Sequence, residues 1–397
     1  MHRRPGRPAL AAVTAALLLL SAEAARADRA ADHAPPPGQW ALVPGTSFLA
    51  SGVAVDDATA GRLGIAGERG PQALIAAGNG AAWDEGSRCL LFMGGGRRDW
   101  GGNEVYRFCL EDMRWQRLTE PSPLPAAAGT TCPAPRNAPV AGVSGDGLVV
   151  AGGRLHAFLS DPFCPKGRRG RIDTAWSLDL SAPDRGWRRL AGAPPDFAGA
   201  LTARNPHTGG IVVVGSDHGV LAEVDPTADA PAQERKQAEA KLSGSDICAE
   251  SDTGIYCLAR GRALYAVEFG PGQRADRLRR LGEPPLGGVG TAPCMVWHPE
   301  RRTLVVLSGA RSVYEIDPGD LSVTRWPNPE GPAPSEETAR LVSKCAYDRR
   351  TGSIVVVRDP RGEVALYRLP APGTVQEEPD KGPGYVRGLP LPGHPLD

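Results

Sequence analysis

The 397-residue sequence has no net charge, because its 45 basic side chains equal its 45 acidic ones. A chain without excess charge gives no overall signal for nucleic acid or an anionic membrane surface. Long apolar runs are also missing, apart from LAAVTAALLLL at residues 10–20, which is shorter than the roughly 20 residues that a membrane-spanning helix needs. We therefore expect no nucleic-acid partner and no membrane span in the mature chain.

The first 27 residues have the pattern of a secretory signal peptide. Arg3, Arg4 and Arg7 precede the apolar run, and the small-residue sequence Ala25-Arg26-Ala27 follows it, which predicts cleavage before Asp28. The mature chain is then expected in the periplasm or outside the cell. Eight cysteines, an even number in an exported chain, favour disulfides over metal sites.

Helix-forming segments are scarce. The 50 glycines and 39 prolines favour turns, and the only stretch that resembles a helix is QERKQAEAKL at 233–242, which we interpret as a surface insertion. A phosphate-binding loop is also missing, because the glycine-rich stretch at 94–102 contains no GxxxxGK[ST] and no helical run follows it. Its glycines are expected to permit a turn with positive φ.

Six segments share one order of strands instead. Their apolar strands, interpreted as the second of each segment, are CLLFMGG, GLVVAGG, GIVVVGS, GIYCLAR, TLVVLSG and SIVVVRD. The third strands share an aromatic or small apolar column: Tyr106, Trp176, Ala222, Tyr265, Tyr314 and Tyr367. A fourth strand follows at Trp115, Trp187, Leu278 and Trp326. An apolar strand without a polar face is buried on both sides, so repeated four-stranded sheets predict an all-β, six-bladed propeller.

The sixth segment lacks a fourth strand of its own. We expect the N-terminal stretch GQWALVPG, around Trp40, to complete the last blade and to close the ring. A seventh blade would need residues 45–73 to pair, but that stretch has no apolar second strand. The expected organisation is a signal peptide at 1–27, a lead-in with the closing strand at 28–73, the propeller at 74–370 and a Pro/Gly-rich disordered tail at 371–397.

These motifs resemble the kelch repeat of secreted bacterial, galactose oxidase-like propellers. The resemblance is strongest in the first two segments, with glycines at 94–96 before Tyr106 and Trp115, and glycines at 152–153 before Trp176 and Trp187. Galactose oxidase-like chemistry would imply a copper site built from two Tyr, two His and a Tyr–Cys crosslink. No Tyr and His are adjacent in this sequence, so the family's catalytic residues are not carried over, and we expect no metal and no cofactor.

Strand alignment suggests how the cysteines pair. Treating the second and third strands of the first segment as a hairpin sets Cys89 opposite Cys109, and the first hairpin of the fourth segment sets Cys248 opposite Cys257. The other candidate pairs are Cys294 with Cys345, in the first strands of the last two segments, and Cys132 with Cys164, in loops of the second. Free buried thiols remain an alternative, whereas zinc or copper is disfavoured because no CxxC or Cys/His spacing is present.

The loops between second and third strands are rich in arginine. Their basic residues are Arg97, Arg98, Arg154, Lys166, Arg168, Arg169, Arg171, Arg260, Arg262, Arg311, Arg358 and Arg361. Their acidic residues are Asp99, Asp161, Asp173, Asp217, Asp359 and Glu363. Because arginine binds carboxylate, sulfate and phosphate in a bidentate manner, this face is expected to hold an anionic ligand, the alternative being a set of solvated loop arginines.

Further candidates come from the same loops. His156 and His218 are placed in them, Trp100 is expected either to stack on a sugar ring or to cap its own blade, and Arg136 in PAPRNAP resembles an arginine of kelch repeats. The candidate ligand-binding set is Arg97, Arg98, Asp99, Trp100, Arg136, His156, Arg171, Asp173, His218, Arg260 and Arg311.

The function predicted from the sequence is a monomeric, exported binding module for an anionic saccharide or a protein partner. The first alternative is a metal-independent carbohydrate-active enzyme, mutarotase-like or lyase-like, which would need Arg136, His156, Asp173 and His218 to converge. A galactose oxidase-like copper oxidoreductase is the least favoured alternative.

Overall fold

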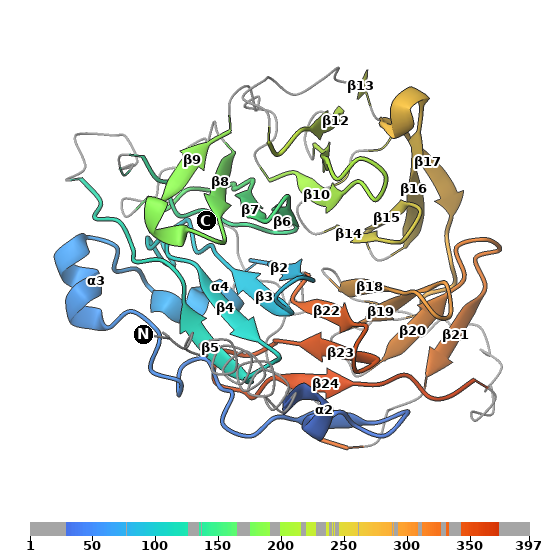
Figure 1. Cartoon of the computed structure of the whole chain (residues 1–397), viewed down its shortest axis with the longest axis horizontal. Coiled ribbons are helices and arrows are strands. Elements are labelled where there is room, and N and C mark those ends of the chain that lie inside the picture. The colour runs from blue at the N-terminus through green and yellow to red at the C-terminus, as the bar shows by residue number, and fades with distance from the viewer. Residues whose placement is uncertain are drawn as a thin grey trace, which may run out of the picture.

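The computed structural model describes residues 29–76, 78–125, 135, 137–164, 175–190, 199–215, 220–227, 236–237, 240, 242, 246–260, 262–287, 289, 293–308, 312–326, 331–332 and 343–372. Six four-stranded antiparallel sheets are arranged in a ring, with β2, β6, β10, β14, β18 and β22 nearest the centre (Figure 1). The chain is thus a six-bladed β-propeller, as the repeat predicts.

Each blade runs from an innermost strand at the channel to an outermost strand at the rim. Blades 1 and 2 are β2(Ala81–Asp84), β3(Cys89–Phe92), β4(Tyr106–Cys109), β5(Arg114–Arg117) and β6(Leu148–Ala151), β7(Arg154–Ala157), β8(Trp176–Asp179), β9(Trp187–Arg189). Blades 3 and 4 are β10(Leu201–Arg204), β11(Ile211–Val214), β12(Val220–Val224), β13(Lys236–Gln237) and β14(Ile247–Glu250), β15(Ile255–Ala259), β16(Ala263–Phe269), β17(Ala275–Gly282). Blades 5 and 6 are β18(Cys294–His298), β19(Thr303–Leu307), β20(Val313–Ile316), β21(Val323–Trp326) and β22(Cys345–Asp348), β23(Ser353–Val356), β24(Ala365–Tyr367), β1(Trp40–Leu42).

Burial of the apolar strands on both faces holds neighbouring blades together. Every residue of β3, β11 and β23 is buried, and the residues of neighbouring blades form shared clusters, such as Val305 of blade 5 with Ile354 of blade 6. Burial of a Val or Ile side chain stabilises by about 1.5–3 kcal/mol. The interfaces between blades therefore form the hydrophobic core.

Blade 2 corrects one interpretation of the repeat. GLVVAGG is not the second strand but the innermost one, β6, and its glycines form the hairpin turn to β7. Gly152 and Gly153 both have positive φ, 57° and 69°, which a two-residue hairpin turn of the tightest kind requires. The glycines at 94–96, in contrast, lie between the second and third strands of blade 1, so the two glycine motifs are not equivalent.

The glycines of blade 1 allow close approach of backbones. A Cβ at Gly96 would lie 2.4 Å from the carbonyl oxygen of Asp161, and one at Gly95 would lie 2.6 Å from that of Trp100. Gly96 also has a φ of 74°. These contacts confirm a structural turn here.

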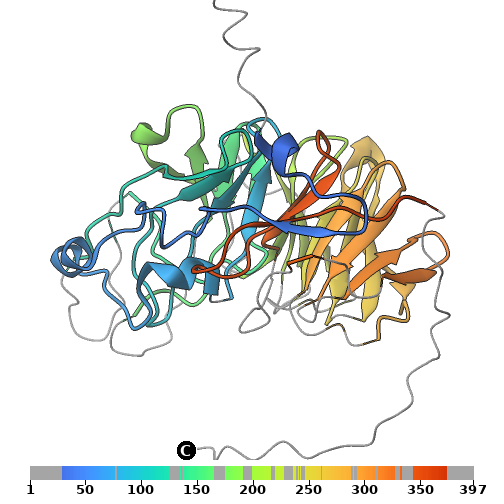
Figure 2. The same ribbon diagram turned by 90° about the horizontal axis from the view of Figure 1, so that it is seen from below.

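The ring is closed by the N-terminal strand, as expected. β1 pairs antiparallel with β24, which sets Trp40 opposite Tyr367 with ring centroids 4.8 Å apart. Figure 2 shows the N-terminal segment in blue running beside the last blade in red. Residues far apart in the sequence thus share one sheet.

Residues 45–76 form no seventh blade. They contain the helices α3(Asp57–Leu63), η1(Gly70–Gln72) and α4(Ala73–Ala76), while α2(Arg29–His33), η2(Pro183–Arg185) and η4(Pro271–Gln273) are the other short helices of the described residues. Asp56 caps the start of α3, where its carboxylate accepts a hydrogen bond from the backbone N–H of Thr59, and Gly64 caps its end with a φ of 72°. Conversely, part of the predicted helix at 233–242 is the strand β13. No helix within the described ranges has the length and apolarity needed to cross a membrane.

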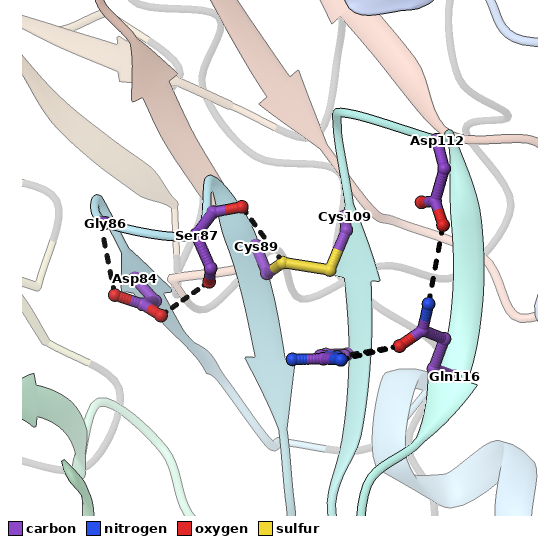
Figure 3. The surroundings of a disulfide bond; sticks show 8 residues. Asp84, Gly86, Ser87, Cys89, Cys109, Asp112 and Gln116 are labelled. Carbon is purple, nitrogen blue, oxygen red and sulfur yellow. Dashed lines mark hydrogen bonds between the residues drawn. A yellow bond between two sulfur atoms is a disulfide. The ribbon is translucent and has the colours of Figure 1, made fainter. Parts of the chain in front are cut away.

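Three disulfides of the described residues join strands. Cys89–Cys109 links β3 to β4 (Figure 3) and Cys248–Cys257 links β14 to β15, as the register predicts. The third, Cys294–Cys345, joins the innermost strands of blades 5 and 6. Cys164 is also disulfide-bonded, and Cys132, its expected partner, lies outside the described residues.

The Cys294–Cys345 and Cys248–Cys257 bridges should differ in their effect on stability, because their sequence separations are 51 and 9. A bridge restricts the unfolded chain more when its loop is longer. Replacing both cysteines of the longer pair by alanine should lower the free energy of unfolding by about 1.5 kcal/mol more than the same replacement in the shorter pair. Guanidinium titrations of the two double variants measure this difference, and equal losses would contradict it.

Candidate functional site

The central channel holds a cavity of about 550 Å³ lined by all six innermost strands. In a propeller, the inner edge of each blade faces the channel, so backbone N–H and C=O groups without a ladder partner point into it. Such groups need partners from elsewhere. Side chains of the channel supply several of them and determine its chemistry.

Asp146 lies at the end of the cavity where the innermost strands begin. Its Oδ2 accepts a hydrogen bond from the backbone N–H of Cys248 at 2.7 Å, and its Oδ1 accepts one from the hydroxyl of Ser343. Its carbonyl oxygen accepts hydrogen bonds from the backbone N–H and the hydroxyl of Thr202, both at 3.0 Å. Asp146 therefore ties blade 2 to blades 3, 4 and 6 and forms the floor of the cavity.

Asp146 is buried, with only 6% of the residue exposed. Burial raises its pKa to about 7, and the nearby negative charges of Glu250 and Asp246 act in the same direction, against the hydrogen bonds from Ser343 and Cys248. Asp146 is therefore close to half-protonated at neutral pH. A carboxyl with this property inside a cavity is a typical site residue.

The opposite end of the cavity is formed by turns between first and second strands. Arg349 of blade 6 lies there and forms ion pairs with Asp252 of blade 4 and, at 3.8 Å, with Glu85 of blade 1. The indole N–H of Trp83 donates to Glu85 at 3.0 Å, and that of Trp297 donates to Asp252 at 3.4 Å. Hydrogen bonding from Arg349 is the main cause that lowers the pKa of Asp252. A guanidinium, two carboxylates and two indoles thus surround the mouth.

Small apolar side chains form much of the wall between floor and mouth. Ala82, Val150, Ala249 and Ala346 line it, one from each of four blades. Arg204 pairs with Glu250 at 3.3 Å beside them. The cavity therefore has polar ends, and its wall combines small apolar side chains with an ion pair.

Lys344 lies directly after Ser343 and does not line the cavity. Its side chain is fully buried, and burial lowers the pKa of its ammonium group to about 7. A lysine that keeps its charge in such surroundings needs hydrogen-bond or ion-pair partners.

Among the described residues, none of the predicted ligand-binding side chains lines the cavity. The loops between second and third strands lie at one end of each blade, and the turns between first and second strands lie at the other end. The arginine-rich loop face predicted from the sequence and the mouth of the cavity are therefore on opposite faces of the ring. Arg136, Arg171, Asp173, His218 and Arg311 lie outside the described residues. Of the four residues that the enzyme hypothesis requires to converge, only His156 is among the described residues.

Two of the predicted residues are buried. Trp100 is 1% exposed and donates its indole N–H to Glu104 at 2.9 Å, so it packs against its own blade and does not offer a face to a sugar. Glu104 also accepts from the hydroxyl of Tyr106 at 3.0 Å, and burial raises the pKa of Glu104.

His156 is also buried, at 0% exposure, because the corrected register places it in β7 and not in a loop. Burial lowers its pKa to about 4, so its ring is neutral, with Nε2 3.2 Å from the carbonyl oxygen of Ala151. Arg154 belongs to the same strand and pairs with Asp179 at 3.2 Å. Neither is available to a ligand at the loop face.

The exposed arginines of blade 1 have carboxylate partners. Arg97 pairs with Asp161 at 2.8 Å, and Arg98 pairs with Glu68 at 3.6 Å. Asp99, a predicted site residue, pairs with Arg69 at 3.4 Å. Positive and negative charges are therefore balanced in this cluster. The count of charged loop residues in the sequence did not include Glu68 and Arg69, because residues 45–76 were not expected to contact these loops.

Comparisons with known proteins identify no family. No family model matches the sequence, and no curated protein matches it significantly. Among solved structures, a protein of unknown function from Bacteroides thetaiotaomicron is 14% identical with a TM-score of 0.45, over 73% of this chain and 69% of that one. An auxiliary nutrient binding protein from Bacteroides ovatus is 13% identical with a TM-score of 0.46, over 74% and 69%. Another from Bacteroides thetaiotaomicron is 10% identical with a TM-score of 0.46, over 72% and 68%. These similarities are too distant to assign a function.

The described residues contain no cluster of three or more His, Cys, Asp or Glu side chains that could hold a metal ion. No direct signal in the sequence marks Asp146, Ser343 or Arg349. Their common feature is a position just before or just after an innermost strand, which becomes recognisable only once the register of each blade is known.

The raised pKa of Asp146 predicts a specific dependence of stability on pH. Because the folded state holds the proton up to a pKa of about 7, stability is greatest below the unfolded pKa near 4 and falls as pH rises towards 7. The free energy of unfolding should fall more steeply in the wild type than in Asp146→Asn, by up to about 1.4 kcal/mol per pH unit.

Urea titrations of both proteins between pH 4 and 8 measure these slopes. The amide cannot satisfy both donors of the carboxylate, so the variant is expected to be less stable overall, and the comparison uses slopes only. Parallel slopes would show that Asp146 does not titrate in this range.

Proposed function

We propose that the chain is an exported, kelch-like propeller that acts as a binding module, with its ligand in the channel cavity. The observation that supports this most directly is the cavity itself, whose volume of about 550 Å³ lies in the range of ligand pockets. The signal-peptide pattern and the disulfides favour a location outside the cytoplasm. The kelch-like order of Tyr106 and Trp115 after the glycines supports the relationship to kelch propellers.

Binding in the cavity should depend on the two tryptophans of its mouth. In a thermal-shift panel of saccharides, amines and carboxylic acids, any cavity ligand should bind several-fold more weakly to Trp83→Leu or Trp297→Leu, because stacking on an aromatic side chain is worth about 0.5–2 kcal/mol. Trp187→Leu is the matched control, since Trp187 is also half-buried but lies on the outermost strand of blade 2. Equal weakening in all three variants would place the ligand elsewhere.

We further propose that the opposite face contacts an anionic saccharide or an acidic protein surface. Arg260 and Arg262 support this, because both are exposed and neither forms an ion pair with a carboxylate of the described residues. The balanced cluster around Arg97 and Arg98 contributes less than the sequence suggests.

The anionic contact can be tested with polygalacturonate as the probe. Arg260→Gln/Arg262→Gln should weaken its binding about three- to tenfold at 50 mM NaCl and have little effect at 500 mM, where exposed charges are screened. Arg279→Gln/Arg280→Gln removes the same charge from the outermost strand of that blade and serves as the control. Salt-independent binding would exclude a charge-based contact.

A metal-independent enzyme is the second candidate, and Asp146 is the observation that favours it. With a pKa of about 7 and a hydroxyl donor in Ser343, Asp146 has the protonation behaviour of a general acid or base. Proton transfer of this kind suffices for mutarotation of a sugar. This role belongs to Asp146 and not to His156.

A further inference from the structure

The charge of the channel cavity differs from that of the loop face. Among the described residues, five carboxylates line the cavity, against two guanidinium groups and no lysine. The carboxylates are Asp84, Glu85, Asp146, Glu250 and Asp252, and the guanidinium groups are those of Arg204 and Arg349. With every group ionised, the lining carries an excess of negative charge on a chain whose total is zero.

Two of these carboxylates have only neutral partners among the described residues. Asp84, at the mouth, accepts hydrogen bonds from the hydroxyl of Ser87 and the backbone N–H of Gly86. Asp146, at the floor, accepts from a hydroxyl and a backbone N–H. The negative charges of Glu250 and Asp246 raise the pKa of Asp146, in addition to the effect of burial, so a positive charge near the floor would relieve an existing repulsion.

The mouth already accommodates one organic cation. The guanidinium of Arg349 lies between carboxylates of blades 1 and 4, and these same carboxylates fix the indoles of Trp83 and Trp297 by hydrogen bonds. Trp297 is held further by stacking on Tyr256, with ring planes 16° apart. The faces of aromatic rings attract cations, and indole does so best. The carboxylates and indoles of the mouth thus make this end of the cavity favourable to positive charge, and the Arg349 side chain is half exposed there.

The wall limits the shape of such a ligand. The innermost strands that span the cavity are four or five residues long, which corresponds to about 10–15 Å at the usual rise of a strand. Between the two ends, the small side chains of Ala82, Ala249 and Ala346 leave room for an extended chain beside the polar groups of the wall.

We propose that the channel cavity binds an elongated organic cation, in which an aromatic or other planar end lies against Trp83 or Trp297 and an apolar chain carries an ammonium or guanidinium group to Asp146. The inference rests on the proposed function, since it names the class of ligand that the cavity takes. Arg349 competes with this cation for the negative charge of the cavity.

The probes that test it are three compounds of nearly one shape: 4-phenylbutylammonium, 4-phenylbutanol and 5-phenylpentanoate. Isothermal titration of the mature wild-type protein at low salt should show the ammonium compound binding at least about tenfold more tightly than the alcohol, and the carboxylate binding least, because a single charge interacting over several ångströms accounts for such a factor.

Variants of the lining separate charge from shape. Asp146→Asn should weaken binding of the ammonium compound about tenfold, and Asp84→Asn, at the half-buried end of β2, should weaken it about threefold, without effect on the alcohol. Arg349→Gln removes the competing cation and should tighten binding about threefold to tenfold. Arg280→Gln is its matched control, because Arg280 has nearly the same exposure, 53% against 51%, and a carboxylate partner, but lies on an outermost strand.

The outcomes distinguish this inference from the proposed function. If the alcohol or the carboxylate binds as tightly as the ammonium compound, or if Arg349→Gln behaves like Arg280→Gln, the cation is the wrong class and the cavity still has a ligand. A second outcome is that a saccharide or carboxylic acid binds in a manner that depends on Trp83 and Trp297 while the ammonium compound does not bind. This outcome also shows that the cavity has a ligand and that the ligand is not a cation. If no compound of any charge depends on either tryptophan, both the inference and the binding cavity are wrong.

Discussion

The pairing of β1 with β24 is the interaction on which the rest of the structure depends. Three backbone-paired residues, Trp40 to Leu42, join the start of the described chain to its last blade, and Trp40 packs on Tyr367. An open ring would leave an unpaired edge at blade 6 and would not fix the distance between blades 1 and 6. The channel has a defined width only because the ring is closed, and every contact across it follows from that width.

Closure also determines where polar chemistry can occur. Six innermost strands present unpaired backbone groups to a common axis, and burial makes unsatisfied groups costly. Asp146 and Glu250 each accept a backbone N–H from a neighbouring or facing blade, at Cys248 and Arg204 respectively. Carboxylates are thus retained in the channel for a structural reason, and their charge gives the cavity its preference among ligands. Structure and recognition depend on the same side chains.

The sequence predicted what apolar patterning and hairpin symmetry control. The apolar strands, which are buried on both faces, predicted the six blades, and the register of two hairpins predicted the Cys89–Cys109 and Cys248–Cys257 disulfides. It misplaced His156 because the Gly152-Gly153 turn resembles the glycine motif of blade 1 while joining different strands. It missed α3 because a seven-residue helix with an Asp cap is too short for a periodic signal. Asp146 could not be found at all, since its partners are 56 to 197 residues away in the sequence.

The two faces of the ring differ because their connections differ in length. On the face of the second-to-third loops, residues 45–76 pack against blade 1, where Phe48 contacts Tyr106 and Trp115 and Glu68 reaches Arg98. That packing buries Trp100 and balances the exposed arginines. On the other face, short turns follow the innermost strands, and Asp84, Glu85 and Asp252 line the channel mouth. A count of charged loop residues therefore misses the charges at the channel mouth, because these come from the first-to-second turns and the strand ends beside them.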